Sequence, residues 1–152
     1  MKSILFVCHG NICRSPMAEF VMKDLVKNAD RSDEFFIASA ATHRDNIWNG
    51  QGSPMYRPAV ACMKKHGVKF DDNKRAALLK MSDYEKYDYI IGMDDENLYF
   101  MKQILGNGEN NKIHLLMDFC GGGEVADPWY TRDFDASYHD ILKGCKALLE
   151  RI

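Results

Sequence analysis

Short apolar runs alternate along the chain with stretches in which apolar residues recur every three or four positions. The runs cover residues 4–7, 35–38, 89–91 and 113–117. Each run has the length and composition of a strand that is buried on both faces. The spaced pattern predicts amphipathic helices over residues 16–28, about 56–67, 96–104 and 138–152.

Strands that alternate with crossover helices predict an α/β fold, a doubly wound sheet of four parallel strands flanked by helices on both faces. The chain has 152 residues, which suits one core, so we expect a single domain over residues 1–152. The last helix has the clearest pattern. Its apolar face is formed by Tyr138, Ile141, Leu142, Cys145, Leu148, Leu149 and Ile152.

Composition narrows the class of protein. Hydrophobic residues make up 46% and charged residues 28% of the chain, and the net charge is −2. This balance argues against nucleic acid or an anionic membrane as partner. No apolar stretch approaches the roughly 20 residues that a membrane span needs, and the N-terminus leads directly into a strand without a signal-peptide pattern. We expect a cytoplasmic monomer.

Five cysteines are present, without a C-x-x-C pair and without zinc-type spacing to histidine. The odd number also argues against a disulfide framework of the kind found in secreted proteins. We expect reduced thiols and no metal site.

The segment from Cys8 to Ser15 carries the clearest chemical signal. The first apolar run ends in Cys8, Gly10 and Asn11 tolerate positive φ in the loop that follows, and Ser15 is expected to cap a helix that Pro16 opens. Loop N–H groups and a helix N-terminus then converge where an anion such as phosphate binds.

Within that segment, Cys8 and Arg14 supply the chemistry. A thiol in such a positive field is expected to ionise readily and act as a nucleophile, and Arg14 offers a planar, bidentate partner for phosphate oxygens. The alternative is a buried strand-end thiol beside a surface charge. The placement between strand and helix favours a cysteine-dependent phosphatase.

The whole chain resembles the low-molecular-weight protein tyrosine phosphatases. Two motifs carry the resemblance: Cys8-His9-Gly10-Asn11-Ile12-Cys13-Arg14-Ser15-Pro16 near the start and Asp127-Pro128-Trp129-Tyr130 near the end. Further matches are Met17-Ala18-Glu19, Ser39-Ala40, Lys65-His66-Gly67 and Met93-Asp94. Either main motif alone is only suggestive, whereas the pair is highly specific.

The resemblance implies a role for each residue of the first motif. Cys8 attacks phosphorus and forms a phosphocysteine intermediate. Arg14 binds the phosphate oxygens, together with the loop amides of His9, Gly10, Asn11, Ile12 and Cys13. Ser15 stabilises the thiolate, and Asp127 acts first as general acid and then as general base. No cofactor or metal is implied, and the implied substrate is a phosphotyrosine-containing protein or peptide.

Other positions match the family as supporting residues. Asn11, Ser39 and His66 correspond to a hydrogen-bonded set that holds the loop in shape. Trp48, Trp129 and Tyr130 are expected to wall a slot deep enough for a phenyl phosphate. His9 departs from the apolar residue that is common beside the nucleophile.

Cys13, Asp94 and Cys62 have expected roles outside the main reaction. In relatives that carry the Cys8 and Cys13 pair, oxidation forms a reversible disulfide that protects the nucleophile. Asp94 matches a family position, and a helix N-cap role is an equally good expectation. We expect Cys62 to be a core residue.

Three other functions stay open at this point. An arsenate reductase on the same scaffold needs further cysteines, and residues 78–94 contain none. A protein arginine phosphatase carries Thr where this chain has Ile12. A non-catalytic phosphate-binding module predicts loss of Cys8, Arg14 or Asp127, and all three are present.

Overall fold

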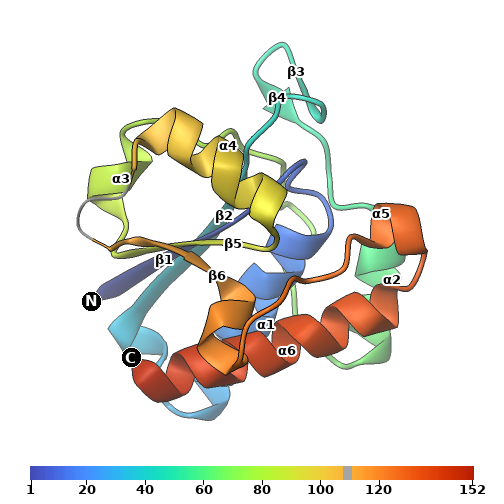
Figure 1. Cartoon of the computed structure of the whole chain (residues 1–152). Coiled ribbons are helices and arrows are strands. Elements are labelled where there is room, and N and C mark those ends of the chain that lie inside the picture. Colours follow the sequence, from blue (N-terminus) through green and yellow to red (C-terminus); the bar gives the residue numbers. More distant parts are fainter. Residues whose placement is uncertain (108–110) are drawn as a thin grey trace.

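The computed structural model describes residues 1–107 and 111–152, and its centre is a sheet of four parallel strands (Figure 1). The strands lie in the order β2-β1-β5-β6. Their bounds are β1 Lys2–Cys8, β2 Phe35–Ala41, β5 Tyr89–Gly92 and β6 Ile113–Leu115. The prediction of four parallel strands is therefore confirmed.

Helices cover both faces of the sheet, as a doubly wound fold requires (Figure 1). Ile4 and Phe6 of β1 belong to the larger apolar cluster, which contains residues of the helices α1 (Arg14–Asn28), α2 (Arg57–Lys65) and α6 (Phe134–Arg151). Leu5 and Val7 point the other way, into a cluster with residues around α3 (Asp83–Lys86) and of α4 (Asp95–Leu105). This period-two alternation explains why β1 reads as a continuous apolar run.

The fourth strand ends earlier than its apolar run. Leu116 and Met117 begin the 3₁₀ helix η2 (Leu116–Cys120) instead of extending β6. Leu116 is fully buried, and a Cβ added at Gly144 of α6 would lie 2.5 Å from its Cγ. The run is thus apolar because η2 packs closely on α6, a reason that a strand pattern does not distinguish.

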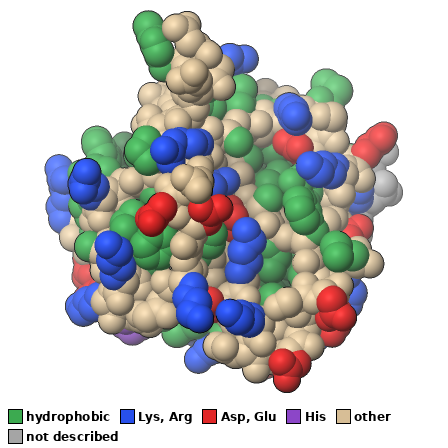
Figure 2. Space-filling model, turned by 180° about the vertical axis from the view of Figure 1, so that it is seen from behind, with side chains coloured by type: hydrophobic (Ala, Val, Ile, Leu, Met, Phe, Trp, Pro, Cys, Tyr) green, Lys and Arg blue, Asp and Glu red, His purple; other side chains and the backbone are tan. Residues whose placement is uncertain are grey.

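A small hairpin occupies a segment that the sequence pattern leaves irregular. Strands β3 (Ile47–Trp48) and β4 (Gln51–Gly52) pair antiparallel. Asn49 and Gly50 form the turn, both with positive φ (49° and 75°), as a two-residue hairpin turn requires. The hairpin stands out from the body of the molecule (Figures 1 and 2). Strands of two residues are too short to give a periodic pattern.

The predicted helices are present with ends shifted by a few residues, and the structure adds short helices between them. The short helices η1 (Ser32–Glu34) and α5 (Pro128–Thr131) lie in segments for which the apolar pattern predicts no helix. Residues 106–111 are rich in glycine and asparagine, which is typical of a turn, but this prediction lies partly outside the described residues, since 108–110 are not described. Within the described ranges, no helix combines the length and the apolar character that crossing a bilayer requires.

The topology determines where a binding site is expected. From the central strand β1 the chain moves to β2 on one side and later to β5 and β6 on the other. In such sheets the loops that diverge at this switch point leave a crevice at the carboxyl ends of the strands. Cys8 is the last residue of β1, and Asp94 follows β5 closely.

Candidate active site

The loop between β1 and α1 carries the nucleophile candidate at its start. Cys8 is 3% exposed, and its Sγ lies 3.0 Å from Ser15 Oγ. The backbone N–H of Ser15 also points at the sulfur, with N and Sγ 3.4 Å apart. Both the hydroxyl and the N–H of Ser15 are therefore in position to donate hydrogen bonds to the sulfur.

Ser15 differs from its expected role as helix cap. The helix begins one residue earlier, at Arg14, and its N-cap is Cys13, which makes no side-chain capping bond. Ser15 lies in the first turn and is fully buried, and its hydroxyl contacts Cys8 instead. A serine followed by proline fits either position, so the pattern alone does not separate a cap from a side chain directed into the site.

Asn11 holds the loop in its shape. It is 1% exposed and adopts φ 56°, a left-handed conformation that asparagine tolerates better than most residues. Its Nδ2 donates to Ser15 Oγ (2.7 Å) and Ser39 Oγ (3.0 Å), and its Oδ1 accepts from the backbone N–H of Ala77 (3.0 Å). The predicted association of Asn11 with Ser39 is present.

The network continues to two charged residues for which sequence reasoning predicts no role. Ser39 Oγ donates to Glu19 Oε1 over 2.6 Å, and Lys74 Nζ lies 3.3 Å from the same carboxylate oxygen. Lys74 also donates to the backbone carbonyl of Ser39. Glu19 is 4% exposed although it is charged. A glutamate on the buried face of a predicted helix is the signal that points to such a buried pair.

His66 does not belong to this network, which corrects the prediction that it supports the loop. It is the C-cap of α2, and its Nε2 lies 3.0 Å from Asp135 Oδ1. Its ring stacks on Tyr138 at 4.0 Å between centroids. Both partners belong to α6. The position of His66 after a helix of nine residues turns it toward α6 and away from the loop.

Arg14 joins three segments of the chain. It is 3% exposed, and its Nη1 donates to Asp94 Oδ2 (2.7 Å) and to the carbonyl of Val125 (3.1 Å). Its Nη2 lies 3.4 Å from Asp127 Oδ2. Burial alone lowers the pKa of Arg14, but the negative charges of Cys8, Asp94 and Asp127 raise it above its usual value. The guanidinium is thus fixed as a cation beside Cys8.

The two carboxylates that contact Arg14 are both helix N-caps. Asp94 Oδ1 accepts from the backbone N–H of Asn97 over 2.8 Å at the start of α4, which confirms the expected cap. Asp127 Oδ1 accepts from Trp129 N over 3.0 Å at the start of α5. Each cap fixes one carboxylate oxygen, so the other is directed toward Arg14.

Several backbone N–H groups of the loop have no hydrogen-bond acceptor among the described residues. Within the described part of the chain, no carbonyl or side chain accepts a hydrogen bond from the N–H groups of Gly10, Asn11, Ile12 or Cys13. These groups stand at the N-terminus of α1, which has 15 residues and a full helix dipole. The loop therefore supplies donors for an anion.

A cavity of about 480 Å³ lies above the loop. Its lining includes the Cys8–Arg14 loop, Asp94, Asp127, Trp129 and Tyr130. The tryptophan and tyrosine are 51% and 81% exposed, so they stand at the rim. Segments about 120 residues apart in sequence thus meet at one cavity.

The aromatic rim differs from expectation at two positions. Trp48 does not line the cavity: it is 79% exposed on the projecting β3–β4 hairpin. Tyr56, which sequence reasoning missed, lines it and lies 5.5 Å from Trp129 between ring centroids. Tyr56 precedes α2, and its backbone N–H donates to Ile12 O. Its position before a helix gave no sequence signal for this role.

His9 takes part in a polar cluster at the mouth of the cavity. Its Nε2 lies 2.6 Å from Asp45 Oδ2 and its Nδ1 lies 3.7 Å from Glu96 Oε1. The ring stacks on that of His43, with the ring centroids 3.9 Å apart and the two planes nearly parallel. His9 therefore links the nucleophile loop to the segments on either side of the entrance.

The second cysteine of the loop has a different environment from the first. Burial, helped by the nearby charges of Cys8 and Asp127, raises the pKa of Cys13 to about 12. Its thiol is therefore protonated at neutral pH and is a poor nucleophile there.

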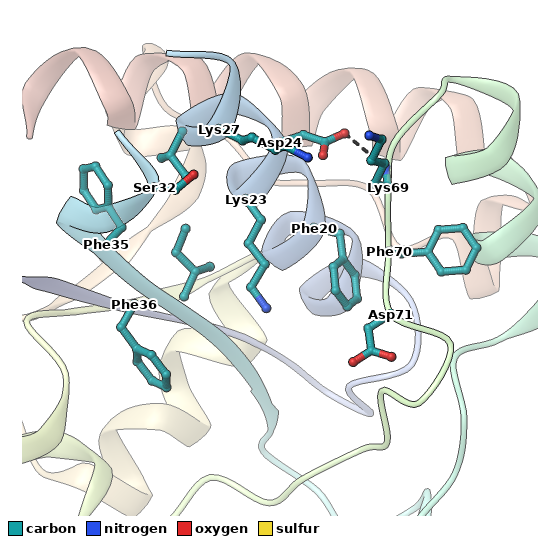
Figure 3. Close-up of a pocket in the computed structure, with 12 residues that line it drawn as sticks. Phe20, Lys23, Asp24, Lys27, Ser32, Phe35, Phe36, Lys69, Phe70 and Asp71 are labelled. Carbon is teal, nitrogen blue, oxygen red and sulfur yellow. Dashed lines mark hydrogen bonds between the residues drawn. The ribbon is translucent and has the colours of Figure 1, made fainter. Parts of the chain in front are cut away.

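A second cavity, of about 510 Å³, lies between α1, β2 and the segment around Phe70 (Figure 3). Figure 3 shows Lys23 and Lys27 from α1 on one side, with Phe20 and Phe70 nearby. It contains no cysteine, histidine or arginine. Lysine and arginine side chains are also spread over the face drawn in Figure 2, among apolar ones. Of these two cavities, the other one is lined by Cys8 and Arg14, the residues that the first sequence motif singles out.

The arrangement at that cavity fits transfer of a phosphoryl group. A buried sulfur in contact with the hydroxyl and N–H of Ser15, a fixed guanidinium and loop N–H groups surround one volume. A carboxyl group, Asp127, stands at its edge and is 28% exposed. Phosphoryl transfer needs a nucleophile, an anion site and a proton donor, and these groups have the chemistry of each.

Comparison with known proteins identifies relatives over the full length of the chain. A profile described as "Low molecular weight phosphotyrosine protein phosphatase" matches residues 3–152. The pig low molecular weight phosphotyrosine protein phosphatase is 38% identical over 99% of this chain and 96% of its own length.

Solved structures with similar folds carry related names. A low molecular weight protein tyrosine phosphatase from Streptococcus pyogenes has 39% identity and a TM-score of 0.88, over 100% of this chain and 93% of its own. A drosophila arginine phosphatase has 30% identity and a TM-score of 0.85, over 99% of this chain and 97% of its own.

Proposed function

This chain belongs to the low molecular weight phosphotyrosine protein phosphatase family, and from that membership we propose that it hydrolyses phosphotyrosine in proteins with Cys8 as nucleophile, Arg14 as phosphate binder and Asp127 as general acid and base. The observation that carries this assignment is the meeting of these three residues, from three separate segments, at one cavity. Ser15 supports it from within the site, because its two donors point at the Cys8 sulfur.

In the first half-reaction, the Cys8 thiolate attacks phosphorus on the side opposite the tyrosine oxygen. The S–P bond forms as the P–O bond breaks, and Asp127 gives its proton to the departing phenolate oxygen. Arg14 and the loop N–H groups hold the three equatorial oxygens, where negative charge is concentrated.

In the second half-reaction, water hydrolyses the phosphocysteine. Asp127, now ionised, takes a proton from the water as its oxygen attacks phosphorus. The S–P bond breaks and the sulfur departs as a thiolate, which the Ser15 hydroxyl and N–H stabilise. Inorganic phosphate leaves and the enzyme returns to its starting state.

A substrate panel tests the proposed activity. We expect the protein to hydrolyse phosphotyrosine peptides and aryl phosphates. We expect phosphoserine peptides to react at least about 100-fold more slowly, because phosphoserine is too short to reach Cys8 past the rim formed by Trp129 and Tyr130. EDTA is expected to leave the initial rates unchanged within about two-fold, since every proposed step uses side chains and backbone N–H groups of the protein and no step uses a metal ion. Hydrolysis of all monoesters at similar rates would contradict the assignment.

Phosphoarginine is the second candidate substrate, because one structural neighbour is named an arginine phosphatase. Ile12 lines the cavity and adds an apolar side chain beside the aromatic rim, which favours a phenyl ring over a charged guanidinium. The same panel decides the matter: a kcat/KM for phosphoarginine above that for phosphotyrosine would replace the proposed substrate. Arsenate, as a fourth member of the panel, tests the reductase alternative.

Asp127→Asn tests the proton donor. Asn keeps an oxygen that can cap α5 but supplies no acidic proton. We expect kcat with phosphotyrosine or phenyl phosphate to fall about 10²–10³-fold, and the loss to shrink with p-nitrophenyl phosphate, whose leaving group needs less protonation.

The matched control for this variant is Asp133→Asn. Asp133 caps α6 through Ala136 N in the same way that Asp127 caps α5, but it does not line the cavity. We expect its kcat to stay within about two-fold of the parent. An equal loss with good and poor leaving groups would rule out the acid role of Asp127.

Three further parts of the assignment follow from the family and from the sequence. We propose that residues 1–152 act as one catalytic domain, that the protein works in the cytoplasm, and that it does so as a monomer. The meeting of Cys8, Arg14 and Asp127, from both ends of the chain, at one cavity supports the first of these.

A further inference from the structure

A cluster of three potential metal ligands lies outside the active-site cavity, between α2 and α6. It consists of Cys62, His66 and Asp135, whose ligand atoms all lie within 4.8 Å of one another. Among residues 1–107 and 111–152, this is the one group of three or more such side chains that meets this distance. None of the three belongs to the proposed catalytic machinery.

The distances match those of a zinc site. His66 Nε2 lies 3.0 Å and Cys62 Sγ 3.6 Å from the same oxygen, Asp135 Oδ1. In a tetrahedral site with ordinary Zn–N, Zn–S and Zn–O bonds, neighbouring ligand atoms stand about 3.3 to 3.6 Å apart. These two distances lie within a few tenths of an ångström of the tetrahedral values, and the ligand atoms of Cys62 and His66 lie within 4.8 Å of each other.

The ligands are held by two helices and by packing. Cys62 and His66 are four residues apart at the end of α2, so they lie on one side of it. The His66 ring is fixed by its stack on Tyr138. Asp135 lies in the first turn of α6, and its other oxygen, Oδ2, accepts from Lys65 Nζ over 2.5 Å. That ion pair leaves Oδ1 directed toward Cys62 and His66.

An ion pair alone does not account for the cluster. Lys65 and His66 explain the carboxylate, but the thiol of Cys62 adds nothing to a salt bridge. It is 5% exposed, and its Sγ points toward Asp135 Oδ1 and the carbonyl of Phe134. Cysteine, histidine and a carboxylate together are a donor set that suits zinc rather than calcium or magnesium, which prefer oxygen ligands.

We propose that Cys62, His66 and Asp135 bind Zn²⁺ and thereby tie the end of α2 to the start of α6. This revises the expectation, drawn from the sequence, that the chain has no metal site and that Cys62 is only a core residue. Cys62 and Asp135 are 73 positions apart, so the spacing of the three residues along the chain does not indicate a metal site.

Binding needs no redox partner. Zn²⁺ accepts electron pairs from sulfur, nitrogen and oxygen, and the Cys62 proton leaves to solvent as the Zn–S bond forms. The surface cavity beside Cys62 and Asp135 leaves the fourth position accessible to water.

The site lies behind one wall of the active-site cavity. Phe134, next to Asp135, has its ring 6.1 Å from Tyr56, and Tyr56 lies 5.5 Å from Trp129. The metal fixes the start of α6, which follows the Asp127 segment in the chain, but touches no proposed reacting group. The metal is therefore expected to act on stability and not on the chemical step. The test of this proposal is thus independent of the test of the proposed activity.

Cobalt is the probe, because Co²⁺ replaces Zn²⁺ and reports its ligands by absorption. The test uses the untagged full chain with Cys8→Ser and Cys13→Ser, which removes the active-site thiols from competition. We expect one equivalent of Co²⁺ to give a thiolate-to-cobalt charge-transfer band and intense tetrahedral d–d bands, both abolished by one equivalent of Zn²⁺. We also expect Zn²⁺ to raise the melting temperature by about 4 °C or more.

Ligand variants in the same background complete the test. Cys62→Ser is expected to lose the charge-transfer band, and Asp135→Asn and His66→Gln to weaken Co²⁺ affinity at least about 10-fold. Cys120→Ser, which changes a partly exposed thiol outside the cluster, is the matched control and keeps the full spectrum. If Cys62→Ser fails to fold by circular dichroism, Asp135→Asn decides, because that side chain is 43% exposed.

Two results would overturn the proposal. One is the lack of a charge-transfer band at one equivalent of Co²⁺ in the parent. The other is a band that persists unchanged in Cys62→Ser or in the folded Asp135→Asn variant, which would locate the metal elsewhere.

Discussion

Cys8→Ser is expected to lower kcat by about 10⁵-fold or more while phosphate still binds. A serine hydroxyl stays protonated in a site that is arranged for a thiolate, so the covalent half-reaction does not begin. Arg14 and the loop N–H groups are unchanged, so the anion site is kept. The measurements are kcat with an aryl phosphate and thermal stabilisation by inorganic phosphate, which should persist in the variant.

Cys13→Ser is the matched control, because it changes the other thiol of the same loop. Its side chain is buried and its thiol pKa is about 12, so it contributes no thiolate at neutral pH. We expect kcat to stay within about ten-fold of the parent. If Cys8→Ser kept more than about 1% of the activity, or if Cys13→Ser were the more damaging change, Cys8 would not be the nucleophile.

Arg14→Lys is the second change with a large expected effect. Lysine keeps the charge but not the planar fork, and a single ammonium cannot replace the contacts to Asp94, Asp127 and the Val125 carbonyl while also binding phosphate. We expect kcat/KM to fall about 10³-fold and inorganic phosphate to inhibit at least about ten-fold more weakly.

A loss of stability is expected to accompany the loss of activity. The Arg14 side chain is 3% exposed and is the buried partner of both carboxylates, so shortening its contacts costs about 1–3 kcal/mol in the free energy of unfolding. Arg75→Lys is the control: it is exposed and donates to the backbone carbonyls of Asp72 and Lys74. Activity of Arg14→Lys within ten-fold of the parent would refute the phosphate-binding role.

Much of the fold could be predicted from the sequence, because the signal is physical and local. Strands β1 and β5 are buried on both faces and so appear as continuous apolar runs, and α6 shows its buried face at helical spacing. The strand pattern is misleading at the end of the fourth apolar run, where the residues form a 3₁₀ helix. Leu116 and Met117 read as strand, yet they are apolar because η2 packs on α6.

The site was predictable where chemistry depends on residues that are close in sequence. The loop from Cys8 to Arg14 could be read directly, and the second motif gave Asp127. The supporting residues were harder, because their contacts are tertiary. His66 follows a helix whose direction decides what it touches, and Lys74 reaches Glu19 from a segment without regular structure. Neither contact can be predicted from the spacing of residues along the chain.

The base of the β3–β4 hairpin packs against the Cys8–Arg14 loop and against the backbone of Ala76. A Cβ on Gly10 would lie 2.4 Å from Asn46 Nδ2, which itself donates to the Gly10 carbonyl. A Cβ on Gly52 would meet the backbone of Ala76 at 1.9 Å. The base of the hairpin therefore tolerates little variation, while its tip, with Trp48 in solvent, is free of packing constraints. Substitutions at the tip are therefore expected to change the outer surface of the hairpin and to leave the contact between Asn46 and Gly10 in place.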